Sequence, residues 1–184
     1  DVTLAVVNNA GNNRITKQVV VTQQSPSSEE YCFVTKWGSP GWDDGQFYYP
    51  AGIAVDNYGA VYVVNSGFTH ESIQKFDNNG NFIMKWGSSG SGNGEFNNTL
   101  GIAINGLNEV YTTECGNNRV QKFDSSGTFL TKWGSYGSKD GEFNEPVDIA
   151  VDKEGMVYIV EKDNHRVQKF DSSGTFLKKW GVYG

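Results

Sequence analysis

The sequence predicts an all-β fold in which four-stranded antiparallel sheets repeat along the chain and stack radially around an axis. One long motif occurs three times, as IQKFDNNGNFIMKWGSSGSGNGEF at 73–96, VQKFDSSGTFLTKWGSYGSKDGEF at 120–143 and VQKFDSSGTFLKKWGVYG at 167–184. A shorter copy, FVTKWGSPGWDDGQF, occupies 33–47. The Trp-Gly pairs of the four copies recur every 47 to 49 residues. A period of this length is typical of a repeat architecture.

The composition favours a β-rich protein outside the cell and disfavours nucleic-acid binding. Aromatic residues make up 14% of the chain, and its 23 glycines fall at fixed offsets in the repeat, where they mark turns. A net charge of −6 suits a secreted or surface-displayed protein. Binding to a phosphate backbone needs clustered Lys and Arg, whereas the repeat scatters them. No apolar run of about 18 residues is present, so we expect no membrane span in this segment.

Each repeat contains four short strand patterns joined by turn residues. In the second copy the patterns are GIAIN at 101–105, EVYTT at 109–113, VQKFD at 120–124 and FLTKWG at 129–134. The last two patterns are joined by Asp-x-x-Gly, in which Asp bonds the backbone ahead of it and Gly supplies the left-handed residue of a bulged hairpin. The four strands are therefore expected to form an antiparallel meander.

Polarity changes in order along the four strands. The first strand is small and apolar, as in Ile102-Ala103-Ile104, and the last two carry Gln and Lys between apolar residues. This gradient is expected when the first strand is crowded near the axis and the last lies at a wide, wet periphery. The tryptophan of each Trp-Gly pair is expected to pack between sheets. The connecting loops are expected to be anchored in the seam by Phe47, Phe96 and Phe143.

The first residues of the chain differ from the repeat. Alternating apolar residues on both sides of a polar turn predict one β-hairpin over 1–23. Residues 24–31, QSPSSEEY, are typical of a linker. We therefore expect three parts, with the repeat segment at 32–184 beginning on a lone outer strand.

The pattern P-x-G-I-A-V-D…V-Y-V-V…R-V-Q-K-F-D-x-x-G-x-F resembles the NHL repeat, one blade of a β-propeller. The resemblance covers 32–184 and implies a β-propeller of four-stranded antiparallel blades. Three blades are present, and the resemblance implies that they are part of a six-bladed ring in a longer surface protein of archaeal or bacterial type. The hairpin at 1–23 resembles the C-terminal hairpin of a PKD-like domain, an immunoglobulin-like sandwich.

The sequence departs from the NHL pattern in two places. The pattern has Asp-x-x-Asn-x-Arg after the second strand, which becomes Glu114 to Arg119 and Glu161 to Arg166. The first repeat, at 65–72, has lost the arginine and gained residues. Asp148 stands where the other two repeats have glycine.

Candidate ligand contacts are expected on the loops after the second strand, because these loops vary between repeats on a constant scaffold. The candidate residues are Asn65, Glu114, Glu161, Asp163, Asn164 and His165. Asp148 is a candidate residue of the central channel. Trp42, in a connecting loop outside the repeat pattern, is a candidate exposed aromatic side chain.

No metal site, cofactor or catalytic residue is predicted. Calcium stays the alternative, through loop carboxylates at Asp43, Asp44, Asp140 and Glu142. Calcium takes about six to eight oxygen ligands, and each loop offers fewer. His70 and His165 lie in non-equivalent loops without the spacing of a zinc site. No nucleophile-and-base motif or phosphate-binding loop is present.

These observations predict a non-catalytic binding or scaffolding module of a secreted or cell-surface protein. Its propeller loops are expected to contact a protein or a carbohydrate. Its open sides are expected to meet the remaining blades or a second copy of the chain. The alternative is a segment of a metal-dependent propeller lyase or lactonase, a class that the resemblance includes, with most of its site in blades outside this segment. RNA binding, known for some NHL propellers, is disfavoured by the acidic composition.

Overall fold

The repeats fold into three four-stranded antiparallel sheets in the computed structural model, which describes residues 2–9, 16–24, 31–67 and 69–181. Every regular element among these residues is a strand, so the predicted all-β fold is confirmed. Four-stranded antiparallel blades are also confirmed, because each sheet pairs its strands in chain order.

The strands of the three blades follow the four predicted patterns. The first blade contains β6 (Pro50–Val55), β7 (Val61–Asn65), β8 (Ser72–Phe76) and β9 (Phe82–Trp86). The second blade contains β12 (Thr99–Ile104), β13 (Val110–Glu114), β14 (Arg119–Phe123) and β15 (Phe129–Trp133). The third blade contains β16 (Pro146–Val151), β17 (Val157–Glu161), β18 (Arg166–Phe170) and β19 (Phe176–Trp180).

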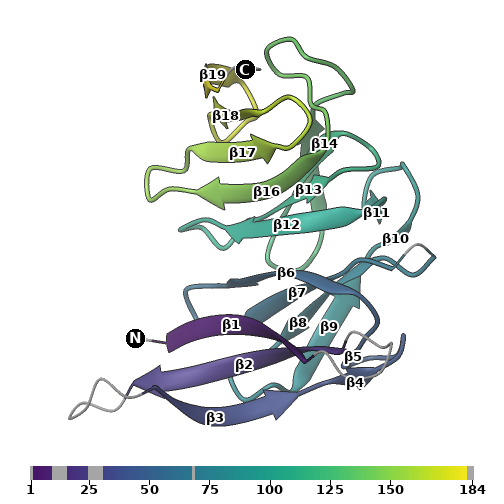
Figure 1. The fold of residues 1–184 in the computed structure, drawn as a ribbon, viewed down its shortest axis with the longest axis vertical. Helices are drawn as coiled ribbons and strands as arrows, with labels where there is room; N and C mark the ends of the chain where they lie inside the picture. Colours follow the sequence, from purple (N-terminus) through teal and green to yellow (C-terminus); the bar gives the residue numbers. More distant parts are fainter. Residues whose placement is uncertain (1, 10–15, 25–30, 68, 182–184) are drawn as a thin grey trace.

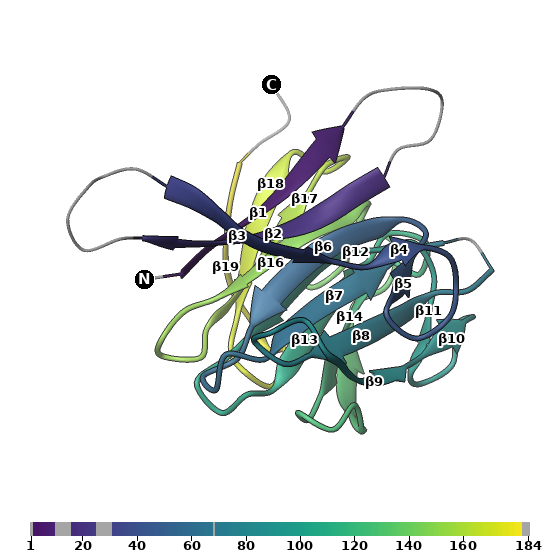
Figure 2. The same ribbon diagram turned by 90° about the horizontal axis from the view of Figure 1, so that it is seen from below.

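The blades stack one above another through their first strands. Figure 1 shows β6, β12 and β16 lying next to one another across the stack. Seen from below, the strands of successive sheets run in different directions, as expected for twisted sheets stacked around an axis (Figure 2). The first strands approach closely at glycine. A Cβ on Gly101 would lie 2.9 Å from the Cα atom of Asp148 in the next blade, so a side chain at this position does not fit.

The hydrophobic core lies between blades rather than within them. Between the second and third blades, Tyr111 and Val120 face Ile159 and Phe170, and all four side chains are fully buried. Trp133 is half-buried at the periphery of this cluster and lies over the turn at Gly174, where a Cβ would come within 2.5 Å of the indole. The predicted packing between sheets is confirmed for Trp37, Trp86 and Trp133, whereas Trp180 is 41% exposed.

The connecting loops are held by short parallel strand pairs and by phenylalanine. These pairs join β4 (Ser39–Pro40) to β5 (Gln46–Phe47) and β10 (Ser88–Ser89) to β11 (Glu95–Phe96), and Tyr136 forms a single bridge to Phe143 in the third loop. The three phenylalanines predicted to anchor the loops are buried, with exposed fractions of 6%, 1% and 0% for Phe47, Phe96 and Phe143. The loops are thus part of the seams between blades.

The Asp-x-x-Gly turns close the hairpins as predicted. In the second blade, Asp124 accepts hydrogen bonds from the backbone N–H groups of Ser126 and Thr128, at 2.8 and 2.9 Å. Gly127 adopts φ of +79°, the left-handed conformation that glycine tolerates best.

Near the N-terminus, three strands form one antiparallel sheet: β1 (Val2–Asn9), β2 (Thr16–Gln24) and β3 (Tyr31–Trp37). The lone outer strand expected from the sequence therefore pairs with the hairpin, through contacts such as Val19 opposite Trp37. Most of the expected linker at 24–31 lies outside the described residues. The division into a PKD-like hairpin at 1–23, a linker and a propeller segment at 32–184 stays a prediction.

Candidate functional site

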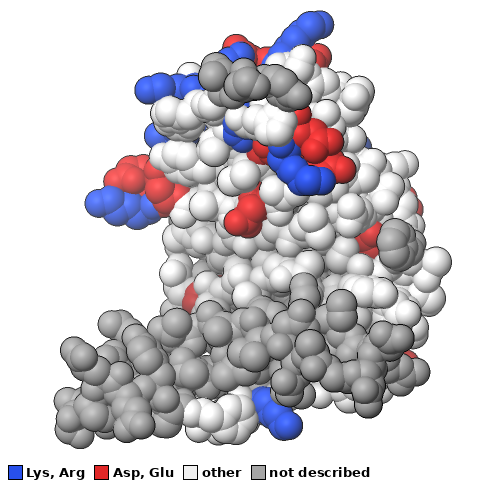
Figure 3. Space-filling model, in the orientation of Figure 1, with Lys and Arg blue, Asp and Glu red and all other residues white. Residues whose placement is uncertain are grey.

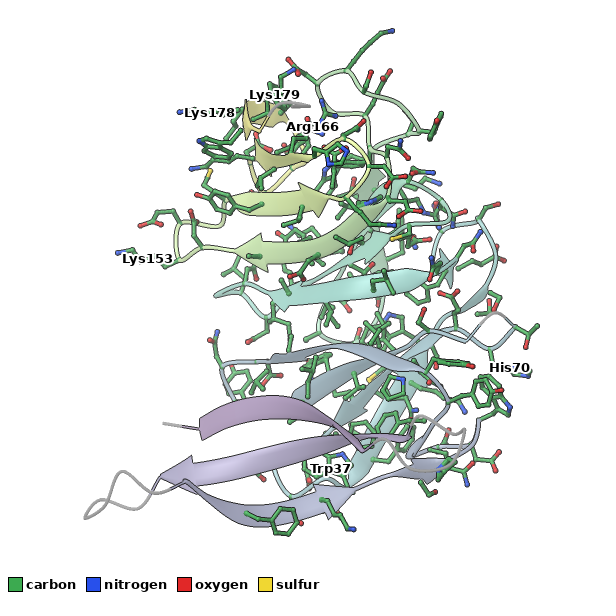
Figure 4. The ribbon with its side chains drawn as sticks, in the orientation of Figure 1. Trp37, His70, Lys153, Arg166, Lys178 and Lys179 are labelled. Carbon is green, nitrogen blue, oxygen red and sulfur yellow. The ribbon has the colours of Figure 1, made fainter. Side chains whose placement is uncertain are left out.

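The loops after the second strands, which carry most candidate ligand residues, lie at one edge of the stack. We call this the loop edge, and it comprises residues 65–67, 69–72, 114–119 and 161–166 together with the connecting loops packed on them. Figure 4 shows His70 of the first blade at the outer limit of this edge and Arg166 of the third blade farther up the stack. The turns between first and second strands, at 56–59, 105–108 and 152–155, lie at the opposite edge.

In the second blade, a buried ion pair fastens the connecting loop to the blade. The Nε atom of Arg119 lies 2.8 Å from Oε1 of Glu114, which has no exposed surface. The remaining guanidinium nitrogens donate to three loop carbonyls, those of Ser91, Gly92 and Glu95, at 2.6 to 2.9 Å. Because one arginine holds both a buried carboxylate and three carbonyls, we call this arrangement the arginine clamp.

The third blade repeats the arginine clamp. Arg166 Nε lies 2.5 Å from Glu161 Oε1, and its other nitrogens donate to the carbonyls of Ser138, Lys139 and Glu142. Buried glutamines complete both clamps. In the third blade, Gln168 donates to the Glu142 carbonyl and to Glu161 Oε1, both at 2.8 Å.

Several of the predicted ligand residues form hydrogen bonds or ion pairs within the arginine clamps. Glu114 and Glu161 are buried against arginine, and half-buried Asn164 donates to Glu161 Oε2 at 2.5 Å. Asn65 is 2% exposed and accepts hydrogen bonds from the backbone N–H groups of two loop residues. Asp163 and His165 are exposed. As ligand contacts, all six residues stay a prediction.

The first blade lacks the arginine clamp. Ser72 occupies the position of the arginine, and Asn65 that of the glutamate. The loop is held instead by Asn65, whose Oδ1 accepts from Tyr48 N at 2.9 Å, and by Gln74, which donates to the Gln46 carbonyl and accepts from Gly45 N. The Trp42 ring lies between those of Tyr48 and His70, with ring centroids 4.1 and 4.5 Å away and interplanar angles of 32°.

Asp148 is exposed on β16, the first strand of the third blade, where the first two blades carry glycine. Its Oδ1 accepts a hydrogen bond from the backbone N–H of Ile149 at 2.9 Å. Among the residues that the structure describes, no group of three or more His, Cys, Asp or Glu side chains is arranged to hold a metal ion. Asp148 as a channel residue stays a prediction.

The opposite edge carries a lysine over a tyrosine in each blade. Lys75 Nζ lies 4.7 Å from the centroid of the Tyr62 ring, and Asp56 accepts from the Tyr62 hydroxyl at 3.1 Å. Burial, with Asp56 beside it, raises the pKa of Tyr62 well above its usual value. These contacts recur at Lys122 and Lys169 with their own tyrosines, so they belong to the architecture of the blade.

The buried thiol of Cys115 is held by a hydrogen bond to a neighbouring blade. Cys115 donates to the carbonyl of Pro146 at 3.1 Å. Burial raises the pKa of its thiol to about 11, so the thiol is protonated at neutral pH and is a poor nucleophile.

Charge is distributed unevenly over the face shown in Figure 3. Lysine and arginine alternate with aspartate and glutamate toward the third blade, whereas the middle of the face is largely uncharged. In the part of the chain that the structure describes, no helix is long and apolar enough to cross a membrane.

Some residues of the loop edge were not singled out from the sequence. The arginine clamps use Gln121 and Gln168, which are fully buried. Glu71 bridges blades, because its carboxylate accepts from the backbone N–H groups of Asn98 and Thr99 in the second blade. Gln121 and Gln168 could have been found in the sequence, because both hold the same place in the repeated V-Q-K-F. Glu71 belongs to no repeated motif, so nothing in the sequence pointed to it.

The NHL repeat model matches residues 96–123 and 143–170. None of the curated protein sequences matches the chain. Among solved structures, the chain is similar to a gluconolactonase from Xanthomonas campestris, at 14% identity with a TM-score of 0.61, covering 91% of this chain and 59% of that one. It is similar to a catalytically inactive virginiamycin B lyase from Staphylococcus aureus with quinupristin, at 12% identity with a TM-score of 0.63. This match covers 99% of this chain and 60% of the lyase chain.

It is also similar to a chain of a nidogen/laminin complex, at 14% identity with a TM-score of 0.62, covering 98% of this chain and 63% of that one. The chain thus spans about 60% of the length of these structures. The structural neighbours include enzymes, and likeness at such low identity shows the fold alone. Two segments of the chain match the NHL repeat, and the fold is a β-propeller fold of four-stranded antiparallel blades.

Proposed function

We propose that the chain is a non-catalytic binding or scaffolding module of a secreted or cell-surface protein, and that it contacts its ligand through the loop edge of the first blade. The observation that carries this proposal is a local departure from the repeat. The second and third blades fasten their loops with an arginine clamp, whereas the first blade presents aromatic rings at the same place. Positions where one repeat breaks a rule kept by the others are where function is expected.

The exposed surface of these rings supports a binding role. Tyr48 and Tyr49 are each 46% exposed, although their ring centroids lie only 4.6 Å apart. Aromatic side chains supply a large contact area for little loss of conformational freedom, and they are enriched at binding surfaces. A protein or a carbohydrate is the expected class of ligand.

A second contact is proposed at the far side of the third blade. Val160 and Trp180 are each 41% exposed there, whereas Val64, which holds the position of Val160 in the first blade, is fully buried under the second blade. This apolar position is therefore buried in the first blade and exposed to solvent in the third. This face is proposed to meet the remaining blades or a second copy of the chain.

The loop-edge proposal is tested with the labelled chain on arrays of immobilised glycans and extracellular-matrix proteins. The comparison is a variant in which Trp42, Tyr48 and Tyr49 are all replaced by serine. We expect retention of the native chain and loss of retention in the variant, with the ligand recovered chemically unchanged by mass spectrometry. Equal retention of both chains, or retention of neither, would count against the loop edge.

The alternative is a segment of a metal-dependent propeller lyase or lactonase. The exposed Asp148 carboxylate on β16 is the observation that favours it. The two proposals separate in the same experiment, because a cleaved ligand that requires added metal would favour the enzyme.

A further inference from the structure

A tryptophan replaces serine at one position of the connecting loop, and only the first of the three loops has it. Trp42 corresponds to Ser91 and Ser138, because each follows the second glycine of the sequence W-G-S-x-G-x-x-x-G. The backbone carbonyls of both serines accept from the arginine of the clamp at 2.6 Å. The first blade has no such arginine, so the tryptophan and the absent clamp are two parts of one local change.

The indole of Trp42 is held in place by the backbone beneath it. A Cβ on buried Gly67 would lie 2.6 Å from the Cη2 atom of Trp42, so the ring occupies the space that a side chain would need. The loop that carries Gly67 is tied to the tyrosines, because Ser66 N donates to the Tyr49 carbonyl at 2.9 Å. The indole and its neighbours therefore form a rigid set of rings, which we call the aromatic row and define as Trp42, Tyr48, Tyr49 and His70.

In the aromatic row Trp42 lies face against face with two neighbouring rings, and polar groups lie beside the row. The Trp42 ring is tilted by 32° from those of both Tyr48 and His70, and Tyr49 meets Tyr48 edge-on at 87°. The Thr69 hydroxyl lies 2.8 Å from Nδ1 of His70, and the exposed carboxylate of Asp43 directly follows Trp42 in the chain. Hydrogen-bonding groups are thus present beside His70 and next to Trp42 in the chain.

The size of the aromatic row fits a small ligand better than a protein surface. An aromatic side chain offers about 150–250 Å². Two half-exposed tyrosines and an exposed histidine therefore present a few hundred Å², below the roughly 800 Å² that each partner buries in a standard protein interface. The rings are preorganised, so little conformational freedom is lost when a rigid ligand settles on them.

We propose that the aromatic row is a platform for the flat rings of a neutral saccharide. This inference rests on the proposed function of the loop edge and adds the class of ligand. A pyranose ring has an apolar C–H face, which covers an exposed tyrosine ring, and a border of hydroxyls, which bond to the Thr69 hydroxyl and the Asp43 carboxylate. The net charge of −6 and the exposed carboxylates at Asp43 and Asp44 disfavour anionic ligands. Tyr48, Tyr49 and His70 make the contact, and Trp42 is a positioning residue between two of them.

The test is calorimetric titration of the full chain with four neutral oligosaccharides: cellohexaose, chitohexaose, maltohexaose and laminarihexaose. Two variants remove different parts of the row. Trp42→Ser installs the residue found in the other two loops, and Tyr49→Ala removes an outer ring without touching the indole. Tyr136→Ala is the matched control, since Tyr136 is a 72% exposed tyrosine of the third connecting loop.

We expect at least one oligosaccharide to bind the native chain, and both row variants to weaken it by about tenfold or more. The control is expected to bind like the native chain. Thermal unfolding of each variant checks the fold, and Tyr49→Ala keeps the test valid if Trp42→Ser is unstable. Binding of none of the four oligosaccharides, or an equal loss in the control, overturns the saccharide inference. Retention on protein arrays that depends on the same rings would then leave the loop edge in place and identify the ligand as a protein.

Discussion

Replacing Arg119 by methionine removes the guanidinium of one clamp and leaves the buried Glu114 carboxylate with hydrogen bonds from Gln121 and Asn117 but without its counter-charge. The Glu114 side chain has no exposed surface, and the two side chains meet at 2.8 Å. Breaking a buried ion pair by removing one partner destabilises a protein by about 3–5 kcal/mol. The loop carbonyls that also lose a donor belong to a partly exposed loop and can bond to water, so we add nothing for them. For a chain of this size, such a loss lowers Tm by roughly 6–20 °C.

The assay is urea unfolding followed by tryptophan fluorescence and by circular dichroism, with coincident transitions as the check on two-state behaviour. A double variant, Glu114→Asn with Arg119→Ser, copies the residues that the first blade carries at Asn65 and Ser72. It removes both charges, so we expect it to be clearly more stable than Arg119→Met. The reasoning fails if Arg119→Met loses less than about 1 kcal/mol, or if the double variant is as unstable as the single one.

Three further results are expected. Trp133→Ala should lower the free energy of unfolding by about 2–4 kcal/mol, because the half-buried indole packs on the next blade. Lys132 is exposed, so Lys132→Ala should change the free energy of unfolding little. Equal small effects of the two substitutions in calorimetry would contradict this packing. Hydrogen bonds from Ser173 and Thr175 lower the pKa of Asp171 to about 2, so its stabilisation is present above the ordinary pKa and is lost as pH falls toward 2. Asp171→Asn should therefore flatten the pH dependence of Tm below about pH 4, and an unchanged profile would refute the link. The chain should self-associate at high concentration through the third blade, and Trp180→Glu should reduce that association in sedimentation; an unchanged distribution would count against this face.

The fold could be predicted because its signals are local. Strand alternation, Asp-x-x-Gly turns and the phenylalanine of each connecting loop act within a few residues and recur at a fixed period. Phe143 is fully buried as expected because its position in the repeat alone places it in a seam.

The candidate site was harder to predict because its contacts join distant residues. The arginine clamp joins Arg119 to carbonyls 24 to 28 residues earlier, and nothing in the local sequence shows that they converge. The contact between the Trp42 and His70 rings likewise depends on how two loops meet. The pairing of β3 with β2 spans the expected linker, and the composition of a linker does not reveal which strands pair on either side of it.

Asp148 holds, on β16, the position that Gly52 and Gly101 hold on the first strands of the other two blades. The first strands of neighbouring blades come so close at Gly101 that a single methyl group does not fit between them. A strand lying against β16 would meet a carboxylate and its Cβ at the corresponding point, and therefore could not approach as near as β16 approaches β12. Gly52 and Gly101 allow the close approach at the two intervals between the three blades, whereas the Asp148 side chain would hold any strand placed against it farther from β16.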